Sequence, residues 1–310
     1  MKLVYPDYYK KFNCIADKCE DTCCAGWEIV VDADSADFYK SAEGEIGNRL
    51  RSEMKIDADG DIVFALKNGR CPFLNSTNLC DIYSCLGQSA LCHTCKMFPR
   101  FIEEYGATCE TGIGLACPEA ARIIVENQDD INFLCEFNNE IPLPNEIDPE
   151  LYFKLLSLRQ KVFDEISSDN DFEAVLINIL KLSGDVDPVL PDIEWCRDVL
   201  LSLDILTNRW KELISAPIER KDFSHKICKL KNIAGYYIYR YFLKSVFDGD
   251  VLAKAYFCVF ACVVINSLSD ETNIADIAHL FSKEVEYSAD NINIVFERLK
   301  NRIGKYNAVF

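Results

Sequence analysis

Cysteine is the residue type in this chain best suited to chemistry, because sixteen of the 310 residues are cysteines. Eleven of them lie between Cys14 and Cys117, whereas the other five are scattered through helical patterns and are expected to pack as small apolar residues. A short loop brings two thiolates to the same centre, and both Zn²⁺ and iron–sulfur clusters accept four thiolates. The sequence therefore predicts a cysteine-ligated metal or iron–sulfur module in its first 117 residues.

The spacing of the cysteines leaves the kind of centre open. The pair in Cys92-His-Thr-Cys95 suits zinc, a cluster or a redox dithiol, although a thioredoxin-like site would need a strand followed by a helix, which the local pattern lacks. The number of clustered cysteines exceeds the four that one tetrahedral zinc needs. This excess favours an iron–sulfur cluster or two metal centres over a zinc-stapled module without catalytic activity.

Charge restricts the partners of the protein. The chain carries 33 basic and 50 acidic residues, which gives a formal net charge of −17. Because phosphate groups are bound by basic surfaces, this charge argues against nucleic acid and against anionic membranes as partners. The acidity either keeps the protein soluble or attracts a lysine-bearing protein substrate.

Two segments bear on localisation. The first residues, MKLVYPDYYKKF, lack the apolar core and the small-residue cleavage site of a secretory signal. The most apolar run covers residues 255–265, which is shorter than the roughly 20 residues that a membrane-spanning helix needs. We therefore expect a cytoplasmic protein in which this run is a buried helix.

The periodicity of apolar residues predicts a mainly α-helical protein of two domains. The first, 1–125, is expected to be loop-rich, with one helix over 35–54 or two that break near Gly44, and a small hairpin over 55–69. A helix should follow Cys117, with Pro118 in its first turn. The second domain, 126–310, is expected to be a helical array. Its helices should begin after the cap Asp148 and cover 171–182, 192–214, 223–247, 251–268 and 273–302.

Two residues close to the cysteines in sequence are candidates for cofactor binding. Trp27 follows Cys23-Cys24-Ala-Gly and could shield a metal site or stack on an adenine ring. Arg100 follows Pro99 and could bind a carboxylate, such as that of a cofactor, or pair with a nearby acid.

Several short motifs around the cysteines follow one another along the chain. They are Tyr-Pro-Asp-Tyr-Tyr-Lys-Lys-Phe-Asn-Cys (5–14), Cys-Glu-Asp-Thr-Cys-Cys-Ala-Gly-Trp (19–27), Cys-Pro-Phe-Leu (71–74), Leu-Cys-Asp-Ile-Tyr (79–83), Leu-Cys-His-Thr-Cys (91–95), Phe-Pro-Arg (98–100) and Cys-Pro-Glu-Ala-Ala-Arg (117–122). In this order they resemble the opening of the flagellin lysine N-methylases. The same set is also similar to a broader group of zinc- or iron-chelating cysteine-cluster proteins.

Two later segments extend the resemblance to the second half of the chain. Residues 234–243, Ala-Gly-Tyr-Tyr-Ile-Tyr-Arg-Tyr-Phe-Leu, resemble the aromatic helix of that family. Residues 282–288, followed by Asn291 and Ile292, resemble its late Ser-Arg-Glu-Ile-Glu-His-Ser motif, with Lys283 and Tyr287 in place of the arginine and the histidine.

The resemblance implies methyl transfer from S-adenosylmethionine to lysine side chains of flagellin, with a [4Fe–4S] cluster. A lysine ammonium must lose its proton before it accepts a methyl group, so Glu286 and Tyr287 are candidate bases. The alternative is a non-catalytic zinc- or iron-binding interaction module.

Cys85 and Cys109 are extra to the family pattern. The candidate metal ligands are the cysteines that match it, Cys14, Cys19, Cys23, Cys24, Cys71, Cys80, Cys95 and Cys117, with Cys92 next.

Overall fold

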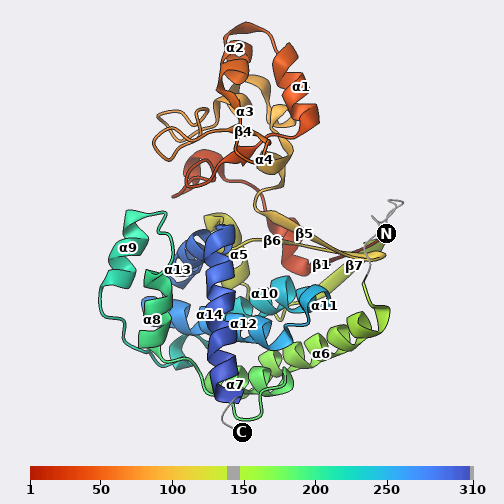
Figure 1. Ribbon diagram of the computed structural model, residues 1–310, viewed down its shortest axis with the longest axis vertical. Helices are drawn as coiled ribbons and strands as arrows, with labels where there is room; N and C mark the ends of the chain where they lie inside the picture. Colours follow the sequence, from red (N-terminus) through yellow and green to blue (C-terminus); the bar gives the residue numbers. More distant parts are fainter. Residues whose placement is uncertain (138–146, 308–310) are drawn as a thin grey trace. The chain divides into compact units, whose positions relative to one another are not determined.

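The structure, a computed structural model, describes residues 1–137 and 147–307, with side chains up to residue 304 (Figure 1). The chain is mainly α-helical, as predicted. Its internal contacts divide it into two units, Asn13–Phe101 and the combination of Met1–Phe12 with Ile102–Phe310. We call these the cysteine unit and the helical unit. The division differs from the expected ranges 1–125 and 126–310, because the first strand pairs with strands beyond residue 102.

Two helices open the cysteine unit, α1 (Ala33–Ser41) and α2 (Gly44–Glu53), and the predicted break near Gly44 is confirmed. Gly44 has a φ of +76°, a left-handed conformation that glycine adopts without steric cost. Gly47 allows a close approach, since a Cβ atom there would lie 2.0 Å from the carbonyl oxygen of Ala42. The two glycines thus allow the sharp turn from α1 into α2.

The predicted hairpin is also confirmed. Strands β3 (Met54–Ile56) and β4 (Ile62–Phe64) are antiparallel, and β2 (Ile29–Val30) pairs with the other edge of β4. The Asp57 carboxylate holds the turn by accepting hydrogen bonds from the backbone N–H groups of Asp59 (3.0 Å) and Asp61 (2.9 Å).

Short helices and loops make up the rest of the cysteine unit. The α-helices are α3 (Asp81–Leu86) and α4 (His93–Met97), and the 3₁₀ turns are Ala16–Lys18 and Gln88–Ala90. A further 3₁₀ turn, Asp7–Lys11, precedes the unit. The core includes the thiols themselves. Its buried residues include Tyr39, Leu50, Phe64 and Phe73 together with Cys24, Cys71 and Cys92.

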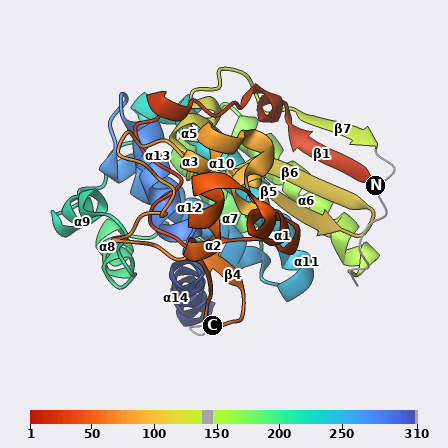
Figure 2. The same ribbon diagram turned by 90° about the horizontal axis from the view of Figure 1, so that it is seen from above.

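A four-stranded sheet in the helical unit was not predicted from the sequence. Its strands are β1 (Lys2–Pro6), β5 (Arg100–Tyr105), β6 (Thr108–Ile113) and β7 (Phe133–Phe137), in the order β5–β6–β1–β7 (Figure 2). β1 runs parallel to β6 and antiparallel to β7. The parallel pair joins segments about a hundred residues apart, which short-range periodicity cannot reveal.

Several helices of the helical unit begin where their caps predict. The Asp148 carboxylate accepts hydrogen bonds from the first turn of α6 (Pro149–Ser167), and Asp171 caps α7 (Phe172–Leu182) in the same way. Pro118 is the first residue of α5 (Pro118–Val125), directly after Cys117.

The central helix of this unit is α12 (Val251–Leu268), which matches its predicted bounds. By length and composition alone α12 could cross a membrane, but 83% of it is buried inside the unit. It contacts α7, α8 (Ile193–Leu201), α10 (Ile227–Tyr241), α13 (Ile274–Phe281) and α14 (Ala289–Asn307). These neighbours explain why α12 is apolar on all sides.

Three predicted helices are interrupted. The range 192–214 contains α8 and α9 (Asn208–Ser215), because Thr207 caps α9 while its hydroxyl and the Leu206 N–H both donate to Glu284. In the range 223–247, α10 lies between 3₁₀ turns at Ser224–Lys226 and Phe242–Lys244, and α11 (Ser245–Asp248) follows the second turn. The range 273–302 contains α13 and α14, which are joined by a π-helical turn, Ser282–Glu286.

Candidate functional site

Six thiols from three segments lie near one another in the cysteine unit, five of them in or against its core, while Cys23 is exposed. The Sγ atoms of Cys23 and Cys24 lie 3.9 Å apart. Electrostatic interactions connect Cys95 with Cys92, Cys24 and Cys23, and connect Cys71 with Cys80, Cys92 and Cys23. The group therefore consists of Cys23, Cys24, Cys71, Cys80, Cys92 and Cys95, which we call the thiol cluster.

Backbone hydrogen bonds hold the first two of these segments together. The Cys71 N–H donates to the carbonyl oxygen of Cys24 at 2.8 Å, and the Gly26 N–H donates to that of Gly69 at 3.0 Å. The guanidinium of Arg49 in α2 then fixes the loop that follows, by donating to Asp81 (2.8 Å) and to the carbonyl of Pro72 (3.0 Å).

The third segment is held by α1 and β2. Asp32, the N-cap of α1, accepts hydrogen bonds from the N–H groups of Ser35 and of His93 (2.7 Å), and these bonds lower its pKa to about 2. The Thr94 hydroxyl donates to the carbonyl of Val30 at 2.8 Å. Cys92 and Cys95 are thereby fixed at the start of α4.

Burial and mutual contact perturb the thiols. Burial raises the pKa of Cys71 to about 11 and also raises the pKa of Cys80. Cys92 and Cys95 share a hydrogen bond, which lowers the pKa of Cys92 and raises that of Cys95. The segment before Cys92 is a 3₁₀ turn and not a strand, so the local context is not that of a thioredoxin-like site.

The donor chemistry of the thiol cluster suits a soft metal or an iron–sulfur cluster, since both use several thiolates from short loops. Within residues 1–137 and 147–307, no three or more His, Cys, Asp or Glu side chains are arranged closely enough to hold a metal ion. The thiol cluster thus has the donor chemistry of a metal site, but its described side chains are not close enough together to coordinate an ion.

The remaining cysteines of the first 117 residues are placed differently. Cys14 is exposed, and Cys19 is half-buried and interacts electrostatically with Cys14 and Cys23. Cys117 belongs to the helical unit, where it precedes α5. The two cysteines that are extra to the family pattern are Cys85, which is exposed in α3, and Cys109, which is buried in β6.

The two predicted cofactor contacts both lie in the cysteine unit. Trp27 is half-buried and packs against the apolar core that contains Cys24, Cys71 and Cys92, and its ring lies 5.6 Å from that of Phe98. This position allows Trp27 to shield the thiol cluster. Arg100 is half-buried at the start of β5.

A second group of interacting polar side chains lies within the helical unit, around the buried carboxylate of Glu286 in the π-helical turn. It accepts hydrogen bonds from the hydroxyls of Tyr236 (3.1 Å), Tyr237 (3.2 Å) and Tyr241 (2.8 Å), and Arg240 Nε lies 3.4 Å away. All four partners come from α10. We call these five residues, with Tyr287, the tyrosine cage.

Tyr287 forms the half-buried side of the cage. Its ring centre lies 5.5 Å from the Arg240 guanidinium, which also lies over the rings of Tyr236 and Tyr241. Burial raises the pKa of Tyr287, with smaller effects from Arg240, Glu286 and Cys117. A phenol with a raised pKa is protonated at neutral pH, so Tyr287 can donate a hydrogen bond.

This geometry assigns different roles to the two predicted bases. The Glu286 side chain is fully buried and is surrounded by four donors, so it is suited to hold Arg240 and the tyrosines in place. Tyr287 is the more accessible of the two. The π-helical turn that carries Glu286 is a feature often found at functional sites.

Arg240 and the three α10 tyrosines were not predicted as site residues. Their spacing at positions 236, 237, 240 and 241 places them on neighbouring parts of one helix, but it is equally typical of a buried apolar face. The signal that distinguishes them is the arginine within the aromatic run, because an arginine that is buried needs a carboxylate partner.

Comparisons with known proteins give three curated relatives. The lysine-N-methylase of Salmonella typhimurium is 30% identical over 130 residues, which are 40% of this chain and 32% of that protein. The lysine-N-methylase of Salmonella choleraesuis matches to the same extent. The flagellar biosynthetic protein FliU of Salmonella muenchen is 29% identical over 137 residues, which are 77% of its length.

No family model and no solved structure matches the chain. The match spans about a third of the length of the two lysine-N-methylases. The chain is therefore related in sequence, over 40% of its length, to curated proteins with these names.

Proposed function

We propose that the chain is an S-adenosylmethionine-dependent protein lysine N-methyltransferase with a cysteine-ligated [4Fe–4S] cluster, and that it acts on lysines of flagellin in the cytoplasm. The observation that carries this proposal is the thiol cluster, since three separate segments bring five cysteines into or against one core, with the exposed Cys23 beside them. The names of the Salmonella relatives support lysine N-methylation and a link to flagellar biosynthesis.

Four thiolates of the thiol cluster would hold the iron–sulfur cluster, with Trp27 covering it. When bound, an iron–sulfur cluster supplies electron transfer or an open iron site for a ligand. The bond changes on the substrate are simple: the C–S bond of the sulfonium breaks, a C–N bond to lysine forms, and the lysine nitrogen gives up one proton. We assign Tyr287 to contact the substrate, and Glu286 to hold the tyrosine cage in place.

Anaerobic purification tests the cofactor. We expect a brown protein with about four irons and four acid-labile sulfides per chain. A colourless protein with stoichiometric zinc would exclude the cluster and favour the alternative, a non-catalytic zinc-binding interaction module. This alternative has structural support, because the cysteine unit builds its core around thiols as metal-stapled modules do.

Incubation with S-adenosylmethionine and flagellin tests the reaction. Lysine masses of flagellin should rise by about 14 Da for each methyl group transferred. If no shift occurs with a cluster-loaded protein under reducing, oxygen-free conditions, the methyltransferase proposal is wrong even though the cofactor proposal stands.

A further inference from the structure

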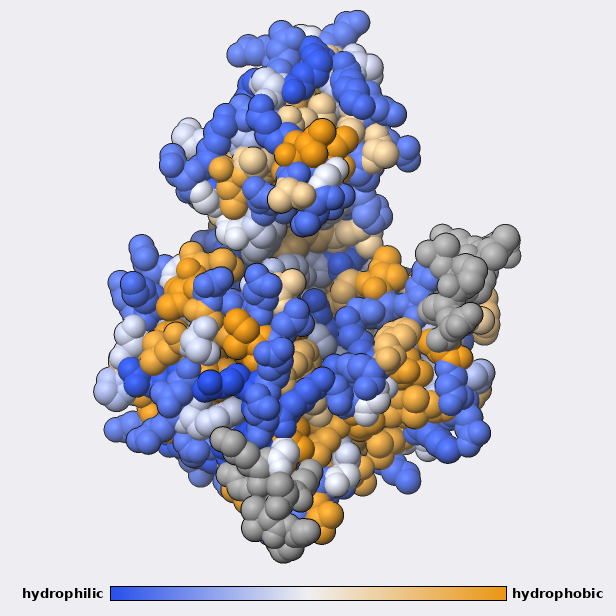
Figure 3. Space-filling model, in the orientation of Figure 1, coloured by the Kyte–Doolittle hydropathy of each residue, from blue (hydrophilic) through white to orange (hydrophobic). Residues whose placement is uncertain are grey.

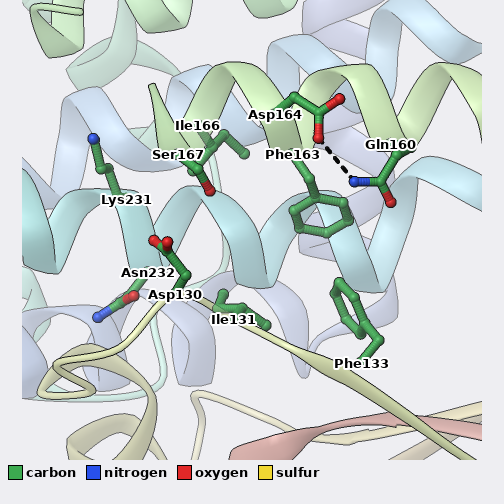
Figure 4. Close-up of a pocket in the computed structure, with 10 residues that line it drawn as sticks. All are labelled: Asp130, Ile131, Phe133, Gln160, Phe163, Asp164, Ile166, Ser167, Lys231 and Asn232. Carbon is green, nitrogen blue, oxygen red and sulfur yellow. Dashed lines mark hydrogen bonds between the residues drawn. The ribbon is translucent and has the colours of Figure 1, made fainter. Parts of the chain in front are cut away.

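A groove runs along α6 in the helical unit. It consists of two cavities of about 110 and 450 Å³, both lined by Phe133, Gln160 and Phe163. Figure 4 shows the smaller one. Its walls are α6 on one side and the segment that leads into β7 on the other. We call it the α6 groove.

The length of the α6 groove suits a short extended peptide. Its helical wall extends from Phe153 to Ser167, and the lining residues recur every three or four positions. Positions 153 and 167 are fourteen steps apart, so the helix rises roughly 21 Å between them. This length matches about six residues of extended chain. Residues from α6 that line the groove are Phe153, Leu156, Ser157, Arg159, Gln160, Phe163, Asp164, Ile166 and Ser167.

One end of the α6 groove presents apolar side chains to solvent. Phe153 is 64% exposed, and the rings of Phe133 and Phe163 meet edge to face at 5.0 Å. In Figure 3 apolar residues gather over α6. Covering such a surface is favourable, because it removes apolar area from water.

The other end carries a net negative charge. Asp130 and Asp164 are exposed on its rim. The Gln160 amide donates to Asp164 at 2.9 Å, which leaves the charge of that carboxylate in place (Figure 4). Of the two cations that line the groove, Arg159 forms a buried bidentate pair with Glu110. Lys231 donates to the neutral Ser168 carbonyl and keeps its charge, so the two carboxylates and this one ammonium leave the end with a net charge of −1.

From this apolar floor and acidic rim we infer that the α6 groove binds an extended peptide of about six residues. A large apolar side chain of the peptide packs against Phe153 and Phe133, and a lysine ammonium lies between Asp130 and Asp164. This inference deepens the proposed function, because the peptide would belong to the protein substrate, but binding requires neither S-adenosylmethionine nor the metal centre.

A capped hexapeptide with phenylalanine near one end and lysine near the other tests the α6 groove, with fluorescence anisotropy on the full chain and without S-adenosylmethionine. Phe153→Ala should weaken binding about tenfold, since it removes an exposed aromatic contact. Asp164→Asn and Asp130→Asn should each weaken binding about two- to fivefold. Matched controls are Phe247→Ala and Asp198→Asn, whose side chains are exposed elsewhere on the helical unit.

Changes in the peptide give a second test on the unaltered protein. Replacing the lysine by norleucine should weaken binding and make it insensitive to Asp164→Asn. The inference is overturned if the hexapeptide shows no saturable binding below about 1 mM, or if the groove variants bind it as the controls do. Because methylation is not measured here, this failure is distinct from failure of the proposed reaction.

Discussion

The carboxylate of Glu286 accepts a hydrogen bond from the hydroxyl of Tyr241 at 2.8 Å, although the two residues are 45 positions apart in the chain. The same carboxylate lies 3.4 Å from Arg240 Nε. A buried charge keeps its place only when its partner is present. The tyrosine cage therefore depends on both Glu286 and Arg240.

Glu286→Gln should lower the free energy of unfolding by about 3 kcal/mol, because it leaves the buried Arg240 without its counter-charge. Urea denaturation monitored by circular dichroism measures this change. The double variant Glu286→Gln/Arg240→Met should lose less stability than the sum of the two single variants, since neither partner is then left alone. Additive losses would contradict a coupled pair.

Gly47→Ala should destabilise the chain by more than about 1 kcal/mol, because the added Cβ atom would lie 2.0 Å from the Ala42 carbonyl oxygen. Gly304→Ala is the matched control. Gly304 lies in α14 with open space around its Cα atom, so the substitution there should stabilise by about 0.5–1 kcal/mol. Equal effects of the two substitutions on the thermal midpoint would refute this account of the α1–α2 turn.

Lys226 should make stability depend on pH. Burial lowers its pKa to about 8, although its ammonium donates to the carbonyls of Asn266 (2.7 Å) and Ser269 (2.9 Å). In the unfolded chain a lysine stays protonated up to about pH 10.4. Between these values the unfolded state binds more protons, so the Lys226 contribution to the free energy of unfolding rises with pH.

Urea denaturation at several pH values between about 7.5 and 9.5 measures this slope. Lys226→Met removes the titrating group. As pH rises, the free energy of unfolding of the native chain should therefore increase relative to that of this variant. A difference that stays constant over this range would show that Lys226 keeps an ordinary pKa.

Iron binding should depend on the cysteines of the thiol cluster. Cys71→Ser and Cys92→Ser should each lose most of the iron and sulfide after anaerobic reconstitution, because a serine hydroxyl is a poor ligand for a soft metal. Cys228→Ser is the control, since Cys228 is exposed on α10 outside the cysteine unit. Full iron retention by both cluster variants would place the metal on other residues.

Tyr287→Phe should reduce methyl transfer to flagellin by about a hundredfold, because it removes the hydroxyl that we assign to donate a hydrogen bond to the substrate. The ring remains over Arg240 in this variant, so the thermal midpoint should change little. Lysine methylation is measured by mass spectrometry. Undiminished methylation would restrict Tyr287 to packing against Arg240.

Local sequence determined most of the helical elements. Asp148 and Asp171 cap α6 and α7 because their carboxylates accept hydrogen bonds from the next backbone N–H groups. The continuous apolar run fixed α12 as a buried helix. These features depend on residues within a few positions of each other, so the sequence alone predicts them.

The tertiary structure decided what depends on distant residues. It paired β1 with β6 across about a hundred residues, and this pairing assigns the first twelve residues to the helical unit. It divided the last predicted helix by a π-helical turn and brought Glu286 to the tyrosines of α10. The cysteines were predictable as a group, but their convergence required hydrogen bonds between separate loops, such as that from Cys71 to Cys24. Such contacts form only when the chain packs, because no short-range pattern specifies which loop meets which.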